Sequence, residues 1–420
     1  MKILLIGGGA REHALAWKIR QSSLCDELVC LGGNAGIAAM AESVPMAGDD
    51  VDGMVRFCQQ FKPDLVVPGA EVPLVLGLVD RLQAWNIPAF GPTAAAAQLE
   101  GSKGFTKDLC AAQGIPTAAF HRVKTVEDAK QLVQRLGVPL VLKADGLAAG
   151  KGVIIAHDLD TAMAAVDSLM QDHAELVLEE LMQGPELSFF AIADGKNVVP
   201  MTSARDYKRA FDGDQGLNTG GMGVYSAVAD ATPVLEGVVM DRIIEPTMAG
   251  LRKQGIAFQG IFYAGLMLTE QGPKLIEYNV RFGDPEAQVL MPRLQDDLVD
   301  LMLASVHGQL NNRTLHWSPQ AALGVVVSDR EYPTGSAGST EIRGLEALEA
   351  DPDTLVFHAG TRRNPDGAVV NNGGRVLTVV RLGDTVASIR PQLMQDLTQH
   401  LGGNNQLRWR TDIGYHEVEA

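Results

Sequence analysis

A short stretch near residue 280 carries the side chains best suited to chemistry. Glu277 and Asn279 stand two residues apart, after an apolar run at residues 261–268 and a polar turn at residues 269–273. This order predicts a hairpin of two strands, in which alternate residues such as Leu275, Glu277 and Asn279 share a face. A carboxylate and a carboxamide oxygen would then lie side by side. Oxygen ligands of this kind suit Mg²⁺, which takes one or two protein carboxylates together with phosphate oxygens.

The residues that follow add further charge to the same stretch. Arg281 offers a cation to an anionic group, Gly283 permits a turn, and Asp284 and Glu286 flank Pro285. A polar hairpin edge with incidental charges is the alternative interpretation of this stretch. The rest of the chain favours a functional site.

A glycine turn near the start of the chain predicts a site for an anion. Apolar residues 2–6 are followed by three glycines, residues 7–9, and then by a helical pattern that runs to Ile19. Backbone N–H groups and the helix dipole at such a turn favour a negative charge, and Arg11 lies nearby. A dinucleotide fingerprint would need a third glycine where Glu12 stands, which disfavours a nicotinamide site. A phosphate group of a smaller ligand fits better, and a tight turn without a ligand is the alternative.

A second carboxylate stands at the end of a predicted parallel strand. Residues 65–68 form a short apolar strand, and Glu71 follows it directly before a helix. Ligands gather at the carboxyl ends of strands in open parallel sheets. Glu71 would bind an amine or sugar hydroxyls there, or it would serve only as an acidic residue at a helix N-terminus.

A glycine-rich loop joins two predicted strands in the middle of the chain. The loop, residues 146–152, follows an apolar strand that ends in Lys143, and it contains Lys151. Its N–H groups could fold over phosphates, and the two lysines would assist. It is not a Walker A motif, because Gly152 stands where Ser or Thr is required and a strand follows instead of a helix. A bare hairpin is the alternative.

Two further regions are polar enough to take part in binding. Residues 175–181 read as a strand that leads into a connector, which could present backbone groups to an adenine ring and a carboxylate to a ribose. Residues 206–209 and 216–223 belong to a long polar, glycine-rich region without predicted structure. Loops of this length are usually functional or disordered, and the concentration of charged side chains favours function.

The elements that must position these residues suggest about three domains for 420 residues. Strands and helices alternate over the first hundred residues, which predicts an open parallel α/β sheet. A helix with Ser102 as its N-cap follows. A long amphipathic helix is predicted over residues 233–253 and another over residues 295–307. From about residue 321 the composition predicts a smaller, mixed α+β domain that shapes a site more than it carries out chemistry.

Composition excludes several functional classes. The net charge of −16 argues against a nucleic-acid surface, and no apolar run reaches the length of about 20 residues that a membrane span needs. The start of the chain lacks a signal-peptide cleavage pattern, so we expect a cytoplasmic protein. The cysteines show no CxxC spacing and are expected to be reduced core thiols: Cys25, Cys30, Cys58 and Cys110.

Taken together, these motifs resemble those of the ATP-grasp carboxylate–amine ligases, specifically the members that join glycine to 5-phosphoribosylamine in de novo purine synthesis. The resemblance covers essentially the whole chain and rests on the stretches GGGAREHA, PGAE, GSK, LVLKADGLAAGKGV, ARDYKRAFDGDQGLNTGGMG and IEYNVRFGDPE. The family usually has a proline at the position of Ala70 and another in the segment at residues 224–229. Many relatives also carry an acidic metal ligand on the strand at residues 261–268, where none stands here, so the number of bound metals stays open.

The resemblance implies a multidomain α/β and α+β fold. Its parts would be an N-terminal open parallel α/β substrate-binding domain at residues 1–101 and a central ATP-grasp domain at 102–325, with a small lid subdomain at about 120–190. A C-terminal α+β domain would cover residues 326–420. The implied reaction makes glycinamide ribonucleotide, ADP and phosphate through glycyl phosphate. The implied cofactors are ATP and Mg²⁺, with Mn²⁺ as an alternative ion, and the partners are the small-molecule substrates and, transiently, enzymes of neighbouring pathway steps.

The resemblance also implies a role for each matching residue. ATP phosphates would be contacted by Lys103 and Lys143, under a loop that contains Gly146, Gly150, Lys151 and Gly152. Adenine and ribose would be held by Glu179, Glu180, Leu181 and Glu186. The metal ligands would be Glu277 and Asn279.

The remaining implied roles concern the substrates. Residues near phosphoribosylamine would be Gly9, Arg11 and Glu71, and further substrate contacts would come from Asn218 and Gly283. Catalytic residues near glycine and the transferred phosphoryl group would be Arg281, Asp284, Asp206 and Lys208.

Other functions are weaker interpretations of the same residues. Another ATP-grasp ligase or a carboxylase would share the nucleotide half, but the N-terminal glycine motif and the loop at residues 206–209 argue against it. A non-catalytic nucleotide-binding regulator would be expected to have lost the metal ligands, yet Glu277 and Asn279 are present. An NAD-dependent oxidoreductase is disfavoured by the missing third glycine.

Overall fold

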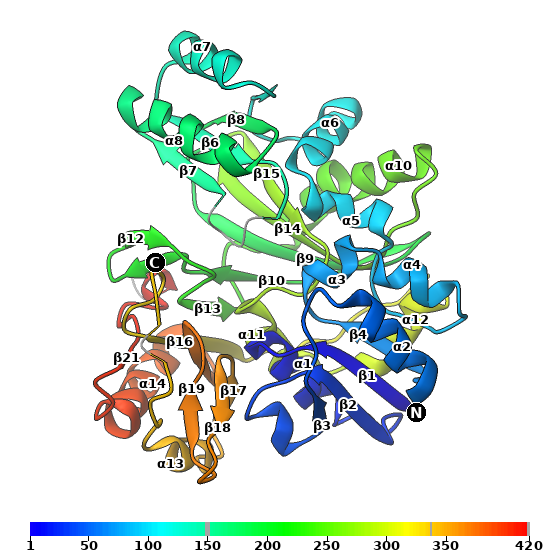
Figure 1. Ribbon diagram of the computed structural model, residues 1–420, viewed down its shortest axis with the longest axis vertical. Coiled ribbons are helices and arrows are strands. Elements are labelled where there is room, and N and C mark those ends of the chain that lie inside the picture. The colour runs from blue at the N-terminus through cyan, green and yellow to red at the C-terminus, as the bar shows by residue number, and fades with distance from the viewer. Residues whose placement is uncertain (148–151, 337, 418–420) are drawn as a thin grey trace.

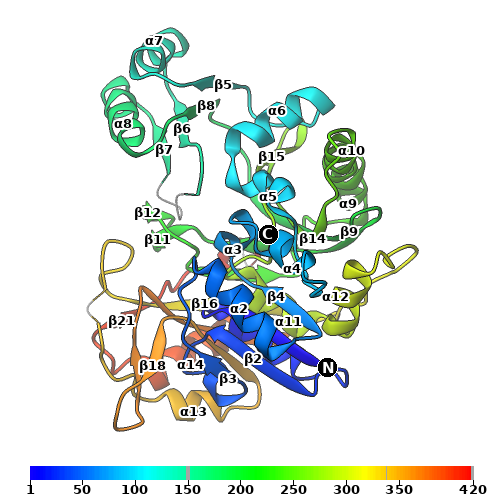
Figure 2. The same cartoon turned by 45° about the vertical axis from the view of Figure 1, so that its right-hand side comes forward.

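The computed structural model describes residues 1–147, 152–336 and 338–417. A central sheet joins an N-terminal part, coloured blue in Figure 1, to a C-terminal part in orange and red, and a small lid stands above them. Figure 2 shows the lid from another side, where it again stands apart from the rest of the ribbon. Among the described residues, no helix has both the length and the apolar character that crossing a membrane requires.

The N-terminal part contains the open parallel sheet that the sequence predicts. Its strand order is β3-β2-β1-β4, and every pair is parallel. The apolar strands are buried between helices, as both faces of a parallel sheet usually are. Its elements are β1 (Lys2–Gly7), α1 (Ala10–Ile19), β2 (Glu27–Gly32), a 3₁₀ turn (Ile37–Ala39), β3 (Glu42–Val44), α2 (Val51–Phe61), β4 (Leu65–Pro68), α3 (Glu71–Val75) and α4 (Leu78–Gln83).

Two helices lead from this part into the lid. The hydroxyl of Ser102 accepts a hydrogen bond from the Phe105 N–H and caps the second helix, as predicted. The lid sheet has the order β5-β8-β6-β7, and its own hydrophobic cluster packs under two helices. These elements are α5 (Ala94–Gly101), α6 (Lys103–Gln113), β5 (Phe120–Val123), α7 (Val126–Leu136), β6 (Leu140–Ala144), β7 (Val153–Ala156), α8 (Leu159–Asp172) and β8 (Leu176–Glu180).

One long sheet connects the centre of the molecule with its C-terminal part. Its strand order is β15-β14-β9-β10-β13-β16-β20-β17, and β21 also pairs with β16. Strand β16 straddles residues 325 and 326, so the sheet runs on through that point of the chain. The strands are β9 (Glu186–Asp194), β10 (Val198–Asp206), β13 (Gly223–Ser226), β14 (Gln259–Thr269), β15 (Gly272–Asn279), β16 (Ala321–Asp329), β17 (Thr354–His358), β20 (Arg375–Gly383) and β21 (Leu407–Arg408).

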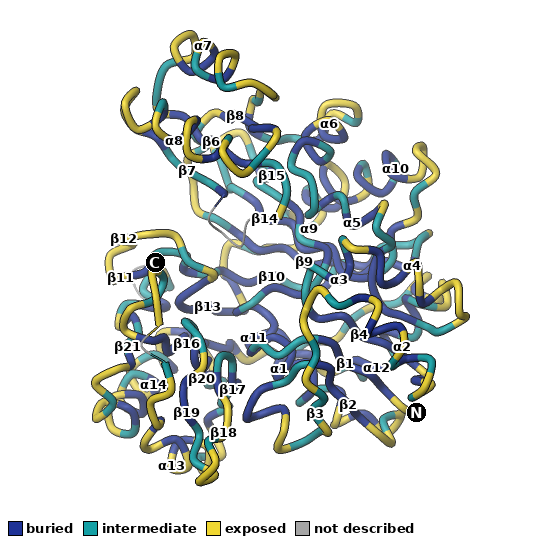
Figure 3. Tube along the Cα trace, viewed as in Figure 1, coloured by how far each residue is buried: buried dark blue, intermediate teal, exposed yellow. Residues whose placement is uncertain are grey.

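Helices and two small hairpins complete the structure. Figure 3 shows that most strands and the inner sides of the helices are buried, whereas β12, many loops and the outer face of the lid are exposed. The remaining elements are β11 (Arg209–Phe211), β12 (Gln215–Asn218), α9 (Pro233–Val239), a π-helix (Met240–Ile244), α10 (Glu245–Lys253), α11 (Glu286–Arg293), α12 (Leu298–Val306), α13 (Leu345–Glu349), β18 (Thr361–Arg363), β19 (Val369–Asn371), α14 (Val386–Leu401) and a 3₁₀ turn (Tyr415–Glu417).

Several predicted elements differ from the structure. The region at residues 206–223, predicted to lack regular structure, holds the β11–β12 hairpin, whose turn has Gly213 and Asp214 at positive φ. The predicted helix over residues 233–253 contains a π-helical turn directly before Pro246. Proline has no N–H for the regular ladder, which accounts for the irregularity. Helix α12 begins at Leu298 because the Asp297 carboxylate caps it.

The strict alternation predicted along β15 is also wrong at one point. Gly265 and Leu266 of β14 pair with Glu277 and Leu275, so Ile276 is an extra residue between them. Such a bulge reverses the side-chain pattern on one side of it. Leu275 therefore lies in the same buried cluster as Tyr278, while Glu277 lines a cleft.

Candidate functional site

Residues from the lid, the central sheet and the N-terminal part line one cleft. It holds about 1150 Å³ of open space, its mouth included. Its walls come from α3, α5 and α6, from lid strands β6 and β8, and from β15 and the loop that follows it. The predicted site residues that line it are Glu71, Lys103, Lys143, Gly146, Gly152, Glu179, Asp206, Lys208, Glu277, Asn279, Arg281 and Asp284.

Other predicted site residues border the cleft. Arg11 Nη1 lies 4.0 Å from Glu71 Oε2, and Lys208 Nζ lies 2.6 Å from Glu186 Oε2. Gly9 backs onto Asp284, since a Cβ built on Gly9 would lie 3.5 Å from the Asp284 Oδ2.

The structure does not bring every predicted residue to the cleft. The Glu180 carboxylate accepts from the Ala119 N–H and pairs with Lys274, Leu181 is half-buried in the connector, and Asn218 is exposed on β12. Gly283 lies under the Glu286 carboxylate. Gly150 and Lys151 lie outside the described residues.

A cluster of lysines surrounds one buried carboxylate inside the cleft. Glu179 Oε2 lies 3.1 Å from Lys107 Nζ and 3.0 Å from Lys143 Nζ. Lys103 Nζ donates to the Gly146 carbonyl at 2.9 Å. Burial lowers the pKa of Lys103 and of Lys107. Two ammonium groups lie beside the Glu179 carboxylate and a third lines the same cleft, so this part of the cleft suits a ligand with several phosphates.

The second oxygen of the same carboxylate is unusual. The Glu179 side chain is 2 % exposed, and among the described residues its Oε1 has no hydrogen-bond partner. A buried acceptor without a donor costs about 1–3 kcal/mol, and more when it is charged. Glu179 lines the cleft, although Oε1 itself is shielded from solvent, so a ligand that reached this oxygen and donated a hydrogen bond to it would remove the cost.

Glu277 and Asn279 lie at the end of β15, where they could hold a metal ion. Both are half-buried and line the cleft. No group of three or more His, Cys, Asp or Glu side chains with metal-binding geometry occurs in the part of the chain that the structure describes. The pair offers one carboxylate and one carboxamide oxygen. This set fits Mg²⁺, which binds through few protein ligands and takes phosphate oxygens and water for the rest.

Arg281 is surrounded by acceptors from its own protein. Its Nη2 donates to Glu100 Oε1 at 2.9 Å and to Asn279 Oδ1 at 3.0 Å, and its Nε lies 3.3 Å from Glu71 Oε2. Burial opposes the charge, but Glu100 and Glu71 outweigh it and raise the pKa of Arg281. Burial also raises the pKa of Glu100. The guanidinium, predicted to face an anion, thus ties the Glu71 carboxylate to the carboxamide oxygen of Asn279.

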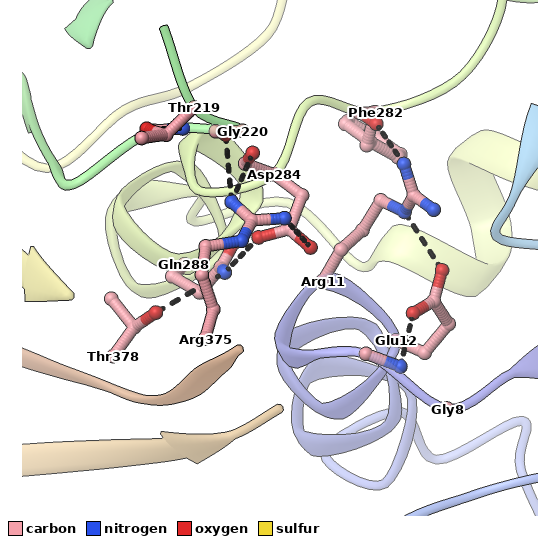
Figure 4. A network of polar contacts seen from close by, with 12 residues as sticks. Gly8, Arg11, Glu12, Thr219, Gly220, Phe282, Asp284, Gln288, Arg375 and Thr378 are labelled. Carbon is pink, nitrogen blue, oxygen red and sulfur yellow. Dashed lines mark hydrogen bonds and ion pairs between the residues drawn. The ribbon is translucent and has the colours of Figure 1, made fainter. Parts of the chain in front are cut away.

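Asp284 is held by an arginine from the C-terminal part. Arg375 Nη2 lies 3.0 Å from Asp284 Oδ2, and its Nη1 donates to the carbonyls of Asp284 and Gly220. Figure 4 shows these contacts, with Gln288 donating to the other carboxylate oxygen at 2.8 Å. Burial opposes ionisation of Asp284, but Arg375 and then Arg11 outweigh it, so its pKa is lowered.

The glycine turn before α1 is occupied by a carboxylate of its own helix. The Gly9 N–H donates to Glu12 Oε2 at 2.7 Å. Arg11 Nε donates to Glu12 Oε1 at 2.7 Å, as Figure 4 shows. A Cβ on Gly7 or Gly69 would lie within 3 Å of Glu12 atoms, so these glycines make room for that side chain. The turn is therefore less available to an external anion than the sequence predicts. Arg11 remains the cation of this corner.

Asp206 and Lys208 form a second charged group in the cleft. Asp206 is flanked by Lys208, whose ammonium pairs with Glu186. Burial raises the pKa of Asp206 to about 7, Lys208 opposes this shift, and Glu286 and Glu186 add to it. Burial would lower the pKa of Lys208, but Glu186 and Asp206 raise it. The cleft thus pairs a carboxyl that titrates near neutrality with a permanent cation.

Four residues of the site have no role predicted from the sequence: Lys107, Glu286, Glu100 and Arg375. Lys107 stands four residues after Lys103 on α6, and this helical spacing could have revealed it. Glu286, noted as an acid beside Pro285, accepts from Tyr263 Oη at 2.7 Å and from Ser188 Oγ. No local signal marks Glu100 or Arg375, because their partners lie 181 and 91 residues away.

The chain matches models of a known protein family along most of its length. Three models of phosphoribosylglycinamide synthetase match the chain: the N domain at residues 1–100, the ATP-grasp (A) domain at 101–287 and the C domain at 322–416. A phosphoribosylamine–glycine ligase of Brucella melitensis is 49% identical over 100% of this chain and 99% of its own length. One of Salmonella typhimurium is 44% identical with the same coverage.

Solved structures show the same relationship. A phosphoribosylamine–glycine ligase of Thermotoga maritima has a TM-score of 0.83 and 30% identity, and the match covers 98% of this chain and 100% of that one. The biotin carboxylase domain of a Hydrogenobacter thermophilus 2-oxoglutarate carboxylase has a TM-score of 0.73 at 16% identity, over 95% and 90% of the two chains, and so shares the fold. Fold and cleft define the class of ATP-grasp ligases. Within that class, the chain belongs to the phosphoribosylglycinamide synthetase family.

Proposed function

We propose that the chain joins glycine to 5-phosphoribosylamine, with cleavage of ATP to ADP and phosphate, and so makes glycinamide ribonucleotide for purine (IMP) biosynthesis. The observation that carries the proposal is the cleft, which the lysine cluster and the Glu277–Asn279 pair line together. Such a site positions reactants and neutralises charge, which is what phosphoryl and acyl transfer need. Relatives that carry this ligase name along their full length support the choice of substrates.

The nucleotide would lie between the lid and β15. Lys103 and Lys143 would contact its phosphates, joined by Lys107, under the loop that contains Gly146 and Gly152. The connector after β8 would hold adenine, and Glu186 would hold the ribose. The unpartnered Oε1 of Glu179 supports this placement, because the 6-amino group of adenine is a donor of the kind that this buried acceptor lacks among the described residues.

Glu277 and Asn279 would hold Mg²⁺, or Mn²⁺ in its place. The ion would supply charge neutralisation for the phosphate oxygens of the nucleotide. Asn279 Oδ1 already accepts from Arg281 at 3.0 Å, and its second lone pair remains available for a metal. Arg281 would therefore orient a metal ligand as well as neutralise charge.

The chemistry would proceed in two transfers. A carboxylate oxygen of glycine attacks the γ-phosphorus of ATP, ADP leaves, and glycyl phosphate forms. The amine of phosphoribosylamine then attacks the acyl carbon, the C–O bond to phosphate breaks, and the amine loses a proton. Lys208 would stabilise the transferred phosphoryl group, and Asp206 would accept the proton, since its pKa lies close to neutrality.

The sugar phosphate would bind on the N-terminal side of the cleft, near Gly9, Arg11 and Glu71. Burial alone would raise the pKa of Glu71, but the positive charges of Arg281 and Arg11 have the larger effect. The net pKa of Glu71 is lowered, so the side chain stays a carboxylate. A carboxylate at this position suits an amine or sugar hydroxyls. Asp284 would face the glycine side, where Arg375 holds it in place.

The division of the chain into domains is part of the same proposal. Residues 1–101 would bind the sugar phosphate, residues 102–325 with a lid at about 120–190 would bind the nucleotide, and residues 326–420 would brace the site. The free cysteines, with Cys30, Cys58 and Cys110 buried, support a reducing, cytoplasmic location.

The test is release of phosphate from ATP with glycine, measured with and without phosphoribosylamine formed in the assay from ribose 5-phosphate and ammonia. We expect rapid release only when glycine and the amine are both present, with glycinamide ribonucleotide identified by its mass. Release that depends on bicarbonate instead of glycine would contradict the proposal in favour of a carboxylase. Nucleotide binding without turnover would contradict it in favour of a regulator.

A further inference from the structure

The last described residues of the chain lie along the loop that carries Asp206 and Lys208. We call residues 408–416 the brace. Hydrogen bonds join the brace to the loop along its length. On the brace side, Arg408 Nη1 donates to the Ala210 carbonyl, and the Thr411 N–H and Oγ1 donate to Asp212. Further along, the Gly213 N–H donates to Asp412, the Gly414 N–H donates to Tyr207 Oη, and Tyr415 Oη donates to Asp214. Figure 1 shows red ribbon from the last part of the chain close to β12.

Arg410 is the centre of this contact. Its side chain is 0 % exposed, the most deeply buried charge in the brace. Nη1 donates to Asp214 Oδ1 at 2.8 Å and to the Arg209 carbonyl at 3.1 Å, while Nε and Nη2 donate to Asp412. The guanidinium also lies 5.2 Å from the centre of the Tyr207 ring. A buried arginine with this many partners fixes both backbones relative to each other.

Tyr207 separates the brace from the cleft. Its ring is buried, stacks on His416 with centroids 5.7 Å apart, and receives the hydrogen bond from Gly414. Its neighbours in the chain, Asp206 and Lys208, line the cleft on the other side. Alternate side chains of an extended backbone point in opposite directions. Anchoring the Tyr207 ring against the brace therefore aims both charged neighbours into the cleft.

Backbone bonds fix the same residue from the other side. The Tyr207 N–H donates to the Gly223 carbonyl and its own carbonyl accepts from the Met222 N–H. The Lys208 carbonyl accepts from Thr219. The hairpin beyond, β11–β12, is exposed and short, and a two-stranded hairpin alone is at best marginally stable. The part of the loop beyond Lys208 therefore depends on the brace for contacts that the hairpin itself does not supply.

From these contacts we infer that Arg410 and Tyr207 are positioning residues, which act on the reaction through Asp206 and Lys208 without touching a substrate. The inference deepens the proposed function and rests on the roles given there to Asp206 and Lys208. In this view the C-terminal part holds a loop of the central domain in its working shape. The purely structural alternative is that Arg410 stabilises the C-terminal part alone.

The experiment compares Arg410→Met and Tyr207→Phe with Arg381→Met. Arg381 is a matched control, because its ion pairs with Asp351 and Asp396 lie inside the C-terminal part, away from the loop. Tyr207→Phe keeps the ring and removes only the hydroxyl, so it guards against a variant that fails to fold. Hydrogen exchange of the full chain and steady-state kinetics are measured for each.

We expect both brace variants to speed exchange at residues 206–214 and to lower kcat about tenfold or more, with little change in the KM for ATP. Arg381→Met should leave the exchange of that loop and kcat as in the wild type. Unchanged loop exchange in the brace variants, or an equal loss of kcat in Arg381→Met, would overturn the inference. If the wild-type chain does not turn over glycine and phosphoribosylamine, the proposed function fails, and loop exchange still decides whether the brace exists.

Discussion

Replacing Glu179 with glutamine should change which purine the cleft accepts. Glu179 Oε2 lies 3.1 and 3.0 Å from the ammonium groups of Lys107 and Lys143, and its buried Oε1 has no partner among the described residues. Ammonium groups only donate hydrogen bonds. In Glu179→Gln the amide oxygen must therefore stay with the lysines, and the amide NH₂ must take the place of Oε1. A hydrogen-bond acceptor that faces the purine becomes a donor.

The size of the effect follows from the two bases. Adenine presents an amino donor at its 6-position, and hypoxanthine presents a carbonyl acceptor. A mismatched buried pair costs about 1–3 kcal/mol, and reversing the preference counts this cost once for each base, so the ratio of ATP to inosine triphosphate affinity should shift by about 2–6 kcal/mol, or about 30- to 20,000-fold. Loss of the Glu179 charge also strengthens the attraction between the lysines and any triphosphate. Because this second effect is the same for ATP and inosine triphosphate, it cancels in the ratio of their affinities.

Isothermal titration with non-hydrolysable analogues of both triphosphates measures this ratio. Glu127→Gln, the same change on an exposed lid residue, is the control and should keep the wild-type ratio. A wild-type ratio in Glu179→Gln would refute the placement of adenine beside this carboxylate.

Three further predictions test other parts of the site. Glu277→Gln should keep the fold, shown by an unchanged circular dichroism spectrum, but abolish turnover at saturating Mg²⁺, because a neutral amide holds the ion poorly; near wild-type rates would contradict this. Arg11→Ala should raise the KM for phosphoribosylamine by about ten- to a hundredfold and spare ATP binding, while Lys143→Ala should do the reverse; equal loss of both ligands in Arg11→Ala would refute the division. Asp206 has a folded pKa of about 7 against 3.8 unfolded, so its contribution to stability falls as pH rises through that window. The free energy of unfolding of Asp206→Asn, measured by denaturant titration relative to the wild type, should therefore be larger at pH 8 than at pH 4. The same difference between variant and wild type at both pH values would contradict the raised pKa.

Local patterns predicted the elements that carry the site. The hairpin that ends in Glu277 and Asn279, the glycine loop after Lys143 and the strand before Glu71 all depend on periodicity or turn residues within about ten positions. The open parallel sheet followed from the alternation of strands and helices. Such signals are contained in short stretches of chain, so a single sequence is enough to read them.

Contacts between distant segments leave no pattern in a single sequence. Glu100 meets Arg281 and Arg375 meets Asp284 only after separate parts of the chain have packed together. The bulge at Ile276 is set by pairing with β14, which the sequence of β15 alone does not specify. By contrast, the spacing from Gly9 to Glu12 is that of a helix N-cap and its third residue. That local signal could have revealed that the glycine turn is filled by its own carboxylate.

The claim that this cleft activates the glycine carboxylate has a direct test. Glycine labelled with ¹⁸O in both carboxylate oxygens is turned over with ATP and phosphoribosylamine, and the released phosphate is analysed by mass spectrometry. Attack by the carboxylate on ATP, followed by attack of the amine on the acyl phosphate, predicts one ¹⁸O atom in each phosphate released. Unlabelled phosphate would mean that water cleaves ATP and would contradict the mechanism assigned to this site.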